Sequence, residues 1–233
     1  MFTLAAADRS MIDTVIDFAQ RMVKDRLVTG TSGNISCLLQ SGSHIAITPT
    51  GVPYHELTVD KMSVVHLSGD HCRGLFPSSE TPMHLGIYQG RKDVQAVVHT
   101  HSMYATTFAV LGEPIPALHY MIAALGGNEI PVTSHYAQYG TLELAQSAVS
   151  AMGDVFSGVL LRNHGAITVG TSVAKAYQHA ILVEEMAELY YRTRCIGDPK
   201  LLTNQQMHDV FDGFKTYGKQ NEKVGSLLLV TLQ

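Results

Sequence analysis

Cysteine is scarce and scattered in this sequence. The three cysteines, Cys37, Cys72 and Cys195, lie far apart and form no CxxC pair. This arrangement excludes the ligand spacing of a zinc ribbon and the framework of a disulfide-rich fold. Cysteines used in this way fit a reducing compartment, and we expect a cytoplasmic protein.

Long apolar runs and basic clusters are also missing. The longest uninterrupted apolar stretch lies near Leu227–Val230 and is far too short to cross a bilayer. Residues Met1 to Ser10 lack the basic start and apolar run of a signal peptide. Lys and Arg are dispersed and the formal net charge is -4, so we expect neither nucleic acid nor membrane as a partner.

No low-complexity tract, Pro/Ser-rich linker or internal repeat divides the chain. Its 233 residues, 45% of them hydrophobic, are enough for one substantial core and short for two. We therefore expect residues 1–233 to form a single domain.

The periodicity of apolar residues predicts alternating groups of helices and strands. Helices are expected over Ala7–Arg26, Pro82–Tyr88, Ser102–Val110 and Thr141–Met152, and from a cap at Thr171 or Ser172 to Arg194. Strands are expected within Gly30–Ser36 and over His44–Thr48, Val64–Leu67, Ala96–Thr100, Val159–Leu161 and Ala166–Val169. Strands in adjacent pairs as well as between helices indicate an α/β fold with a mixed or antiparallel sheet and helical layers.

Two histidines alternate along one predicted buried strand, in Val97-Val-His-Thr-His101. Because side chains alternate between the faces of a strand, His99 and His101 project from the same face. Two imidazoles in this arrangement can bind one metal ion. An isolated pair of this kind is more often one buried, hydrogen-bonded histidine and one surface histidine, so a metal site needs further ligands.

His164 and Glu80 are candidates for those ligands. His164 lies in the turn Arg162-Asn-His-Gly165 between two apolar strands, where the glycine allows a close backbone approach. Alternatively, this histidine bonds its own backbone. Glu80 follows Pro77-Ser-Ser79 at a predicted helix start, where it can reach a metal or carry a proton. Alternatively, Ser79 caps the helix and Glu80 complements the helix dipole.

Three loops offer hydrogen-bond donors suited to phosphate. They are Gly30-Thr-Ser-Gly-Asn34, Thr48-Pro-Thr-Gly51 and the segment around Ser78 and Ser79. Their backbone N–H groups and hydroxyls suit an anion. None carries the GK[ST] of a Walker loop or a GxGxxG fingerprint, so each alone is an ordinary turn.

In combination, these segments resemble the class II aldolase/adducin family. The resemblance extends from about residue 8 to 218, and we find no match beyond Lys219. The matching segments are Gly30–Ser36, Ile47–Gly51, Pro77–Glu80, Val97–His101, His119–Ala124, Gly126–Asn128, Ile130–Pro131, Asn163–Gly165 and Phe214–Gly218.

The resemblance implies a three-layer α/β fold whose mostly antiparallel or mixed central sheet is flanked by helices. It implies Zn²⁺ bound by three histidines, His99, His101 and His164, with Glu80 as fourth ligand and proton carrier. It also implies a cyclic homotetramer in which Tyr120 comes from a neighbouring subunit, and Tyr217 matches a further active-site tyrosine. The implied phosphate-binding residues are Gly33, Asn34, Thr50, Gly51, Ser78 and Ser79.

The implied activity is reversible cleavage of L-fuculose 1-phosphate, or of a related deoxyketose 1-phosphate, to dihydroxyacetone phosphate and an aldehyde. Zinc would stabilise the negative charge left by cleavage as a Lewis acid, although cobalt, manganese or nickel also suit a histidine-rich site. Glu80 would leave the metal when substrate binds and then donate a proton. Tyr120 would act as acid or base at the C4 hydroxyl or aldehyde oxygen. No lysine Schiff base is required.

Two segments depart from the family pattern and leave the aldehyde open. Thr81-Pro-Met-His84 stands where a bulky aromatic residue and a basic residue are expected, and Tyr136–Gly140 differs from an expected aromatic loop. The same chemistry on 5-deoxyribulose 1-phosphate or 5-methylthioribulose 1-phosphate is therefore an alternative, with methylthioribulose-1-phosphate dehydratase as a further one. A ribulose-5-phosphate 4-epimerase is expected to have an aspartate where this chain has His119-Tyr-Met-Ile122. A non-catalytic adducin-like module would be expected to lack the metal ligands.

Overall fold

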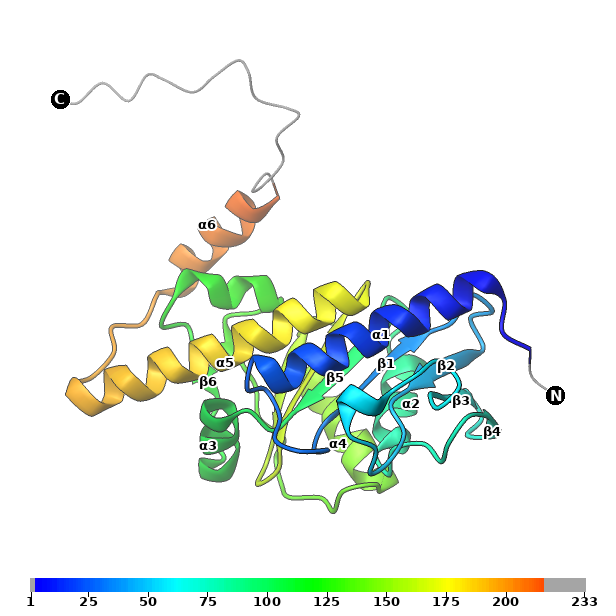
Figure 1. The fold of residues 1–233 in the computed structure, drawn as a ribbon. Coiled ribbons are helices and arrows are strands. Elements are labelled where there is room, and N and C mark those ends of the chain that lie inside the picture. Colours follow the sequence, from blue (N-terminus) through cyan, green and yellow to red (C-terminus); the bar gives the residue numbers. More distant parts are fainter. Residues whose placement is uncertain (1–2, 216–233) are drawn as a thin grey trace.

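A seven-stranded sheet forms the centre of the protein, and its strands pair antiparallel throughout (Figure 1). The computed structural model describes residues 3–215. The strand order is β4-β3-β2-β1-β5-β9-β8. The strands are β1 (Asn34–Leu38), β2 (His44–Ile47), β3 (Ser63–His66), β4 (His71–Arg73), β5 (Ala96–Thr100), β8 (Gly158–Leu161) and β9 (Gly165–Gly170). A separate ribbon pairs β6 (Ile115–Pro116) with β7 (Glu129–Ile130).

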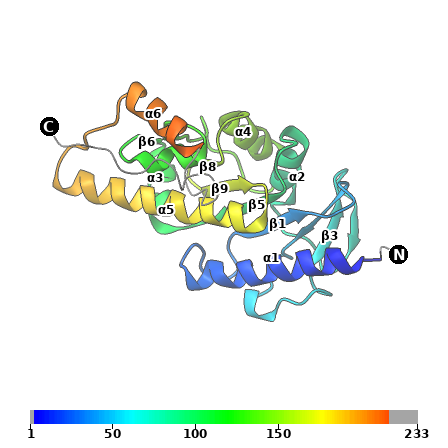
Figure 2. The same cartoon turned by 90° about the horizontal axis from the view of Figure 1, so that it is seen from above.

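Helices cover both faces of the sheet and produce three layers (Figure 2). One face packs against α1 and α5, through residues such as Ile12, Val98 and Ala176, and the other packs against α2 and α4, through Met83 and Val97. The helices are α1 (Ala6–Lys24), α2 (Thr81–Gly90), α3 (Met103–Leu111), α4 (Leu142–Met152), α5 (Val173–Ile196) and α6 (Asn204–Phe214), with short 3-10 helices η1 (Tyr54–Glu56) and η2 (Tyr120–Leu125). The expected antiparallel sheet between helical layers is confirmed.

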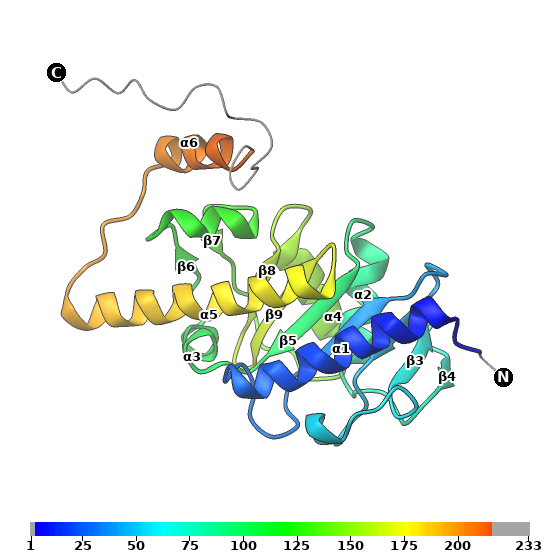
Figure 3. The same ribbon diagram turned by 45° about the horizontal axis from the view of Figure 1, so that its top comes forward.

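A further apolar cluster lies on the α5 side of β8 and joins α3, η2 and α6 to the rest of the protein. It contains Phe108 of α3, Ile122 of η2, Leu182 of α5 and Met207 of α6. Figure 3 shows η2 and α6 on the opposite side of α5 from α3. This part of the molecule therefore packs around α5.

Local capping explains where several helices begin. The Thr141 hydroxyl accepts a hydrogen bond from the backbone N–H of Leu144, and the Ser172 hydroxyl accepts one from that of Lys175, as expected for helix caps. The alternative in which Ser79 caps α2 is wrong. Glu80 occupies the cap position with its side chain turned elsewhere, and the Ser78 hydroxyl accepts the Glu80 N–H at 3.2 Å.

The strand register brings three strand ends together. Asn34, the first residue of β1, pairs with His99 of β5, and Thr100 at the end of β5 pairs with Ala166 of β9. Because neighbouring strands run in opposite directions, β5 ends where β1 and β9 begin. Val97 faces α2 and α4, and strand alternation places His99 on the same face, beside the start of α2.

Within the part of the chain that the structure describes, no helix combines the length and apolar character needed to cross a membrane.

Candidate metal centre and phosphate pocket

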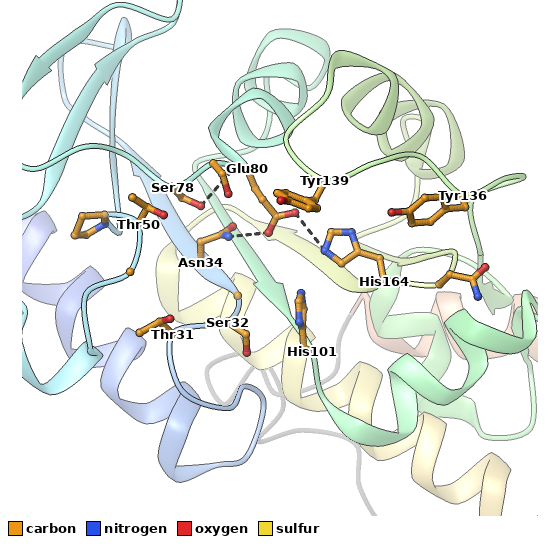
Figure 4. Close-up of a pocket in the computed structure, with 15 residues that line it drawn as sticks. Thr31, Ser32, Asn34, Thr50, Ser78, Glu80, His101, Tyr136, Tyr139 and His164 are labelled. Carbon is orange, nitrogen blue, oxygen red and sulfur yellow. Dashed lines mark hydrogen bonds and ion pairs between the residues drawn. The ribbon is translucent and has the colours of Figure 1, made fainter.

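Four side chains, those of Glu80, His99, His101 and His164, converge where these strand ends meet the start of α2. Figure 4 shows three of them, Glu80, His101 and His164, at the cavity beside this point. Nε2 of His99 lies 3.0 Å from Oε2 of Glu80 and 2.9 Å from Nε2 of His101. Nε2 of His164 lies 3.3 Å from Oε1 of Glu80. One ligand atom from each residue lies within 4.8 Å of those of the others. The structure thus brings together all four residues that the sequence analysis assigns to a metal.

The turn that carries His164 is built for close approach. Asn163 has a positive φ of 56°, an uncommon conformation that asparagine tolerates better than most residues. A Cβ atom at Gly165 would lie 2.3 Å from the carbonyl oxygen of Thr100 and 3.0 Å from Cδ2 of His101. Glycine at this position therefore allows β9 to start directly against the end of β5.

The protonation pattern tests whether these residues fit a cation. Nδ1 of His99 lies 2.9 Å from the carbonyl oxygen of Ala166, which can only accept, so this nitrogen carries a proton. Nε2 of His99 consequently points at Glu80 and His101. Oε1 of Glu80 is buried without a hydrogen bond among the described residues, although the His164 ring is close. Nitrogen lone pairs and carboxylate oxygens at these distances require a positive charge between them, and three imidazoles with one carboxylate fit a divalent metal ion.

The local electrostatics favour the metal-binding forms of these ligands. Burial raises the pKa of Glu80, but the neighbouring His99 and His164 outweigh it and hold that pKa below its ordinary value. Burial and the charge of His99 lower the pKa of His101 to about 3 and that of His164 to about 4. Burial also lowers the pKa of His99, but Glu80 and the Ala166 carbonyl together outweigh burial and raise that pKa. The lowered pKa values keep His101 and His164 neutral and Glu80 ionised at neutral pH, which are the forms that bind a metal.

A cavity of about 430 Å³ opens beside the four ligands. Glu80, His101 and His164 form part of its wall. All six residues assigned to phosphate binding also line it: Gly33, Asn34, Thr50, Gly51, Ser78 and Ser79. A cluster of nitrogen and carboxylate ligands and a set of hydroxyl and amide donors thus share one cavity.

Backbone hydrogen bonds join two of the phosphate loops. Ser78 N–H donates to the Thr48 carbonyl at 3.2 Å, Thr50 N–H donates to the Phe76 carbonyl at 3.0 Å, and Pro49 and Pro77 form an isolated antiparallel bridge. Gly51 and Gly33 have φ values of 67° and 72°, conformations that favour glycine. The loops are therefore held beside each other without using the side chains that face the cavity.

The cavity has further lining residues that were not assigned as site residues from the sequence. They are Thr31, Ser32, Pro49, Tyr136, Tyr139 and Asn163. The first three lie within the two recognised Gly/Thr loops, and Asn163 directly precedes His164 in the turn. Tyr136 and Tyr139 come from a distant loop, and the available sequence signal was the comparison of Tyr136–Gly140 with the aromatic loop expected of the family.

The tyrosines assigned to proton transfer lie elsewhere. Tyr120 begins η2, is 42% exposed, and packs against His119 and Phe214 rather than lining the cavity. Within one chain, Tyr120 therefore does not reach the four ligands. It could act only at the site of a neighbouring subunit, which is the position expected for it from the sequence. Tyr217 lies outside the described residues.

The residues that follow Glu80 point into the protein. Thr81, Met83 and His84 are buried, and none of them lines the cavity. The departure of this segment from the expected family pattern therefore alters the packing beneath the site. It provides no direct contact with the cavity that would identify the aldehyde.

Comparisons with known proteins agree with this geometry. Residues 13–191 match the family described as Class II Aldolase and Adducin N-terminal domain. An L-fuculose phosphate aldolase of Escherichia coli O6:H1 is 41% identical over 92% of this chain and 97% of its own. A 5-deoxy-D-ribulose 1-phosphate aldolase of Bacillus thuringiensis is 38% identical over 89% of this chain and 97% of its own.

The similarity extends to a solved structure. An L-fuculose 1-phosphate aldolase superposes with a TM-score of 0.84 at 36% identity, covering 91% of this chain and 98% of the other. Fold, cavity and sequence therefore agree, and the chain belongs to the class II aldolase and adducin family.

Proposed function

We propose that this protein is a zinc-dependent aldolase that cleaves a ketose 1-phosphate to dihydroxyacetone phosphate and an aldehyde. The observation that carries the proposal is the shared cavity, in which Glu80, His101 and His164 lie beside the six predicted phosphate-binding residues. A non-catalytic module has no need for four convergent metal ligands. The aldolase relatives named above support the same reaction.

The bound metal supplies Lewis-acid stabilisation of the negative charge that develops on the substrate when the carbon–carbon bond breaks. The phosphate loops bind the other end of the substrate, which fixes the position of the reacting carbons. Glu80 is ionised in the resting site, takes up a proton once substrate is bound, and donates it to the dihydroxyacetone phosphate carbon after cleavage. Its carboxylate suits this role because it lies at the cavity wall and is held by a hydrogen bond from Asn34 at 3.0 Å.

The proposal extends to residues beyond this cavity and to assembly. Tyr120 of a neighbouring subunit exchanges a proton with the C4 hydroxyl or aldehyde oxygen, and Tyr217 completes the site. This arrangement requires a second copy of the chain, and the proposed assembly is a homotetramer with active sites between subunits, working in the cytoplasm. The exposed position of Tyr120, 42% accessible on a single chain, supports a contact with another copy.

A second substrate class is 5-deoxyribulose 1-phosphate or 5-methylthioribulose 1-phosphate. The 38% identical relative from Bacillus thuringiensis favours it, because that protein is named for the first of these compounds. Both classes release dihydroxyacetone phosphate and differ only in the aldehyde.

A cleavage assay tests the function. Purified zinc-loaded protein is incubated with L-fuculose 1-phosphate, 5-deoxyribulose 1-phosphate, 5-methylthioribulose 1-phosphate and ribulose 5-phosphate, and dihydroxyacetone phosphate is measured. Release that a chelator abolishes and zinc restores is the expected result, and the relative kcat/KM values identify the aldehyde. Epimerisation of ribulose 5-phosphate without release from any ketose 1-phosphate would instead assign an epimerase.

A further inference from the structure

A chain of buried polar side chains runs from the metal ligand Glu80 into the interior, beneath β1. Nδ2 of Asn34 lies 3.0 Å from Oε2 of Glu80, and Oδ1 of Asn34 lies 2.5 Å from Nε2 of His84. Nδ1 of His84 lies 2.7 Å from the Ser36 hydroxyl, which lies 2.8 Å from the Tyr88 hydroxyl. His84 and Ser36 have no exposed surface, and Asn34 and Tyr88 are each 3% exposed. Burial makes every partner in this chain costly to lose.

The chemistry of the end groups fixes the direction of each hydrogen bond. The Glu80 carboxylate only accepts, so the Asn34 amide must turn its NH₂ group toward it. The amide oxygen then faces His84 and also only accepts, so Nε2 of His84 carries the hydrogen. The His84 ring is completely buried and neither of its hydrogen-bond partners is a carboxylate, so the ring is neutral and has a single N–H.

The remaining bonds follow from that tautomer. Nδ1 of His84 is left with a lone pair and accepts the Ser36 O–H, and the Ser36 oxygen in turn accepts the Tyr88 O–H. All donors therefore point toward Glu80. Reversing the Asn34 amide would place two oxygens against each other at Glu80 and two donors against each other at His84.

We propose that His84 is a positioning residue, whose Nε2–H holds the Asn34 amide with its NH₂ group toward Glu80 and the phosphate cavity. Asn34 lines that cavity and has two N–H groups, of which one donates to Glu80. The second N–H is thereby kept for the substrate. His84 links the orientation of a metal ligand to that of a phosphate ligand without touching either metal or substrate.

This inference rests on the proposed function for its catalytic consequence, but its structural core can be tested on the protein alone. Long-range ¹H–¹⁵N correlation spectra of the zinc-loaded protein, with His84 assigned by comparison with the His84→Gln variant, report which ring nitrogen carries the proton. We expect the Nε2–H tautomer across neutral pH. An Nδ1–H tautomer or a doubly protonated ring would overturn the proposal.

Three variants separate positioning from packing. His84→Met fills similar space but donates no hydrogen bond, His84→Gln can place an N–H close to the position of Nε2, and Tyr88→Phe breaks the same chain at its far end. Each variant is compared with the original protein in five measurements. They are the affinity of the zinc-loaded protein for inorganic phosphate, KM, kcat, the visible spectrum of the cobalt-substituted protein and the thermal unfolding midpoint.

We expect His84→Met to weaken phosphate binding and kcat/KM by about 10-fold, the lower end of the effect of removing an outer partner of a metal ligand, because His84 acts on Glu80 through Asn34, and to shift the cobalt bands. His84→Gln should restore most of both properties. Tyr88→Phe should lower the unfolding midpoint, since it removes the O–H that donates to the buried Ser36 oxygen, while its phosphate affinity and cobalt spectrum remain those of the original protein.

Equal phosphate affinities and cobalt spectra in His84→Met and Tyr88→Phe would assign His84 a packing role only and overturn the proposal. If His84→Met does not fold, the tautomer measurement and His84→Gln still decide. A protein that cleaves no ketose 1-phosphate, yet shows the Nε2–H tautomer and the spectral shift, would overturn the proposed function and leave the role of His84 in place.

Discussion

The two ends of the cavity are built in different ways. At the metal end, His99 is completely buried on β5 and its ring is fixed by a bond to the Ala166 carbonyl. At the phosphate end, Gly51 and Thr50 are exposed residues of a loop, and a Cβ atom on Gly51 would meet open space. One end is specified by side chains packed on strands, and the other by the conformation of the backbone.

This difference determines what each end tolerates. A metal ligand requires a particular nitrogen or oxygen within a few tenths of an ångström, so its identity and its packing both matter. A phosphate loop requires N–H groups that converge, which many side chains permit provided the backbone keeps its shape. Substitutions at the metal end should therefore abolish function, whereas those at the phosphate end should weaken binding in steps.

Replacement of His99 should have the largest effect. His99→Ala removes the ligand that faces both Glu80 and His101, so we expect loss of metal and a fall in kcat/KM of more than about 100-fold, since even outer partners of a ligand cost up to this much. Metal content measured by atomic emission, together with the cleavage assay, tests this expectation.

His179→Ala is the matched control. His179 is also a buried histidine whose Nδ1 contacts a backbone carbonyl, that of Val169 at 2.7 Å, but it lies on α5 on the other face of the sheet. The His179→Ala variant should therefore be less stable and still bind the metal. Full metal content and activity in His99→Ala would refute the assignment of the centre.

The next largest effect should come from Gly165→Ala, which tests whether the metal end depends on packing as well as on ligand identity. The new Cβ would lie 2.3 Å from the Thr100 carbonyl and 3.0 Å from the His101 ring. Overpacking of this kind costs about 1–3 kcal/mol of unfolding free energy, and it should displace His101 enough to weaken metal binding. Denaturant unfolding and zinc titration provide the measurements.

Gly197→Ala serves as the control for that substitution. Its backbone is extended and nothing lies within 4 Å of the position that the new methyl group would occupy, so stability and zinc affinity should remain unchanged. Equal behaviour of the two variants would mean that the close approach of β9 to β5 is unimportant for the ligands.

The metal end was also the more predictable from sequence. Strand alternation alone placed His99 and His101 on one face, and the glycine after His164 indicated the close approach found in the turn. These signals are local, because they depend on neighbours one or two positions away. The elements that carry them, β5, β8 and β9, were predicted to within one residue at each end.

Other parts depended on contacts distant in the chain. The bond from His84 to Asn34 joins residues 50 positions apart, and no local pattern indicates it. Strands β4, β6 and β7 have three, two and two residues, too short for a period to be visible. The start of α6 is different, because its capping box from Thr203 to Gln206 is a local signal, although no helix was predicted there.

A pair of glycine substitutions should sharpen the contrast between the two ends at a smaller scale. Gly33→Ala and Gly51→Ala both force alanine into the left-handed region, at about 1–2 kcal/mol each. Only the Cβ of Gly33 would also collide, at 2.6 Å, with the carbonyl oxygen of His99. Gly33→Ala should therefore weaken both zinc and phosphate binding, whereas Gly51→Ala should weaken phosphate binding alone. Isothermal titrations of both variants with zinc and with inorganic phosphate test this expectation. Equal zinc affinities of Gly33→Ala and Gly51→Ala would contradict it.

The smallest effect should come from the serine hydroxyls, where the two ends of the cavity meet. Ser79 is exposed, so Ser79→Ala should cost about 1 kcal/mol of binding, roughly a fivefold rise in KM, without changing zinc affinity. Ser78 is buried and its hydroxyl accepts the N–H of Glu80, so Ser78→Ala should also disturb the metal ligand and lower kcat. If both variants change only KM, Ser78 contributes to phosphate binding alone and does not affect the metal ligand Glu80. If Ser78→Ala lowers kcat as expected, one hydroxyl couples the backbone-built end to the side-chain-built end, since the same serine binds phosphate and orients the residue that carries the proton.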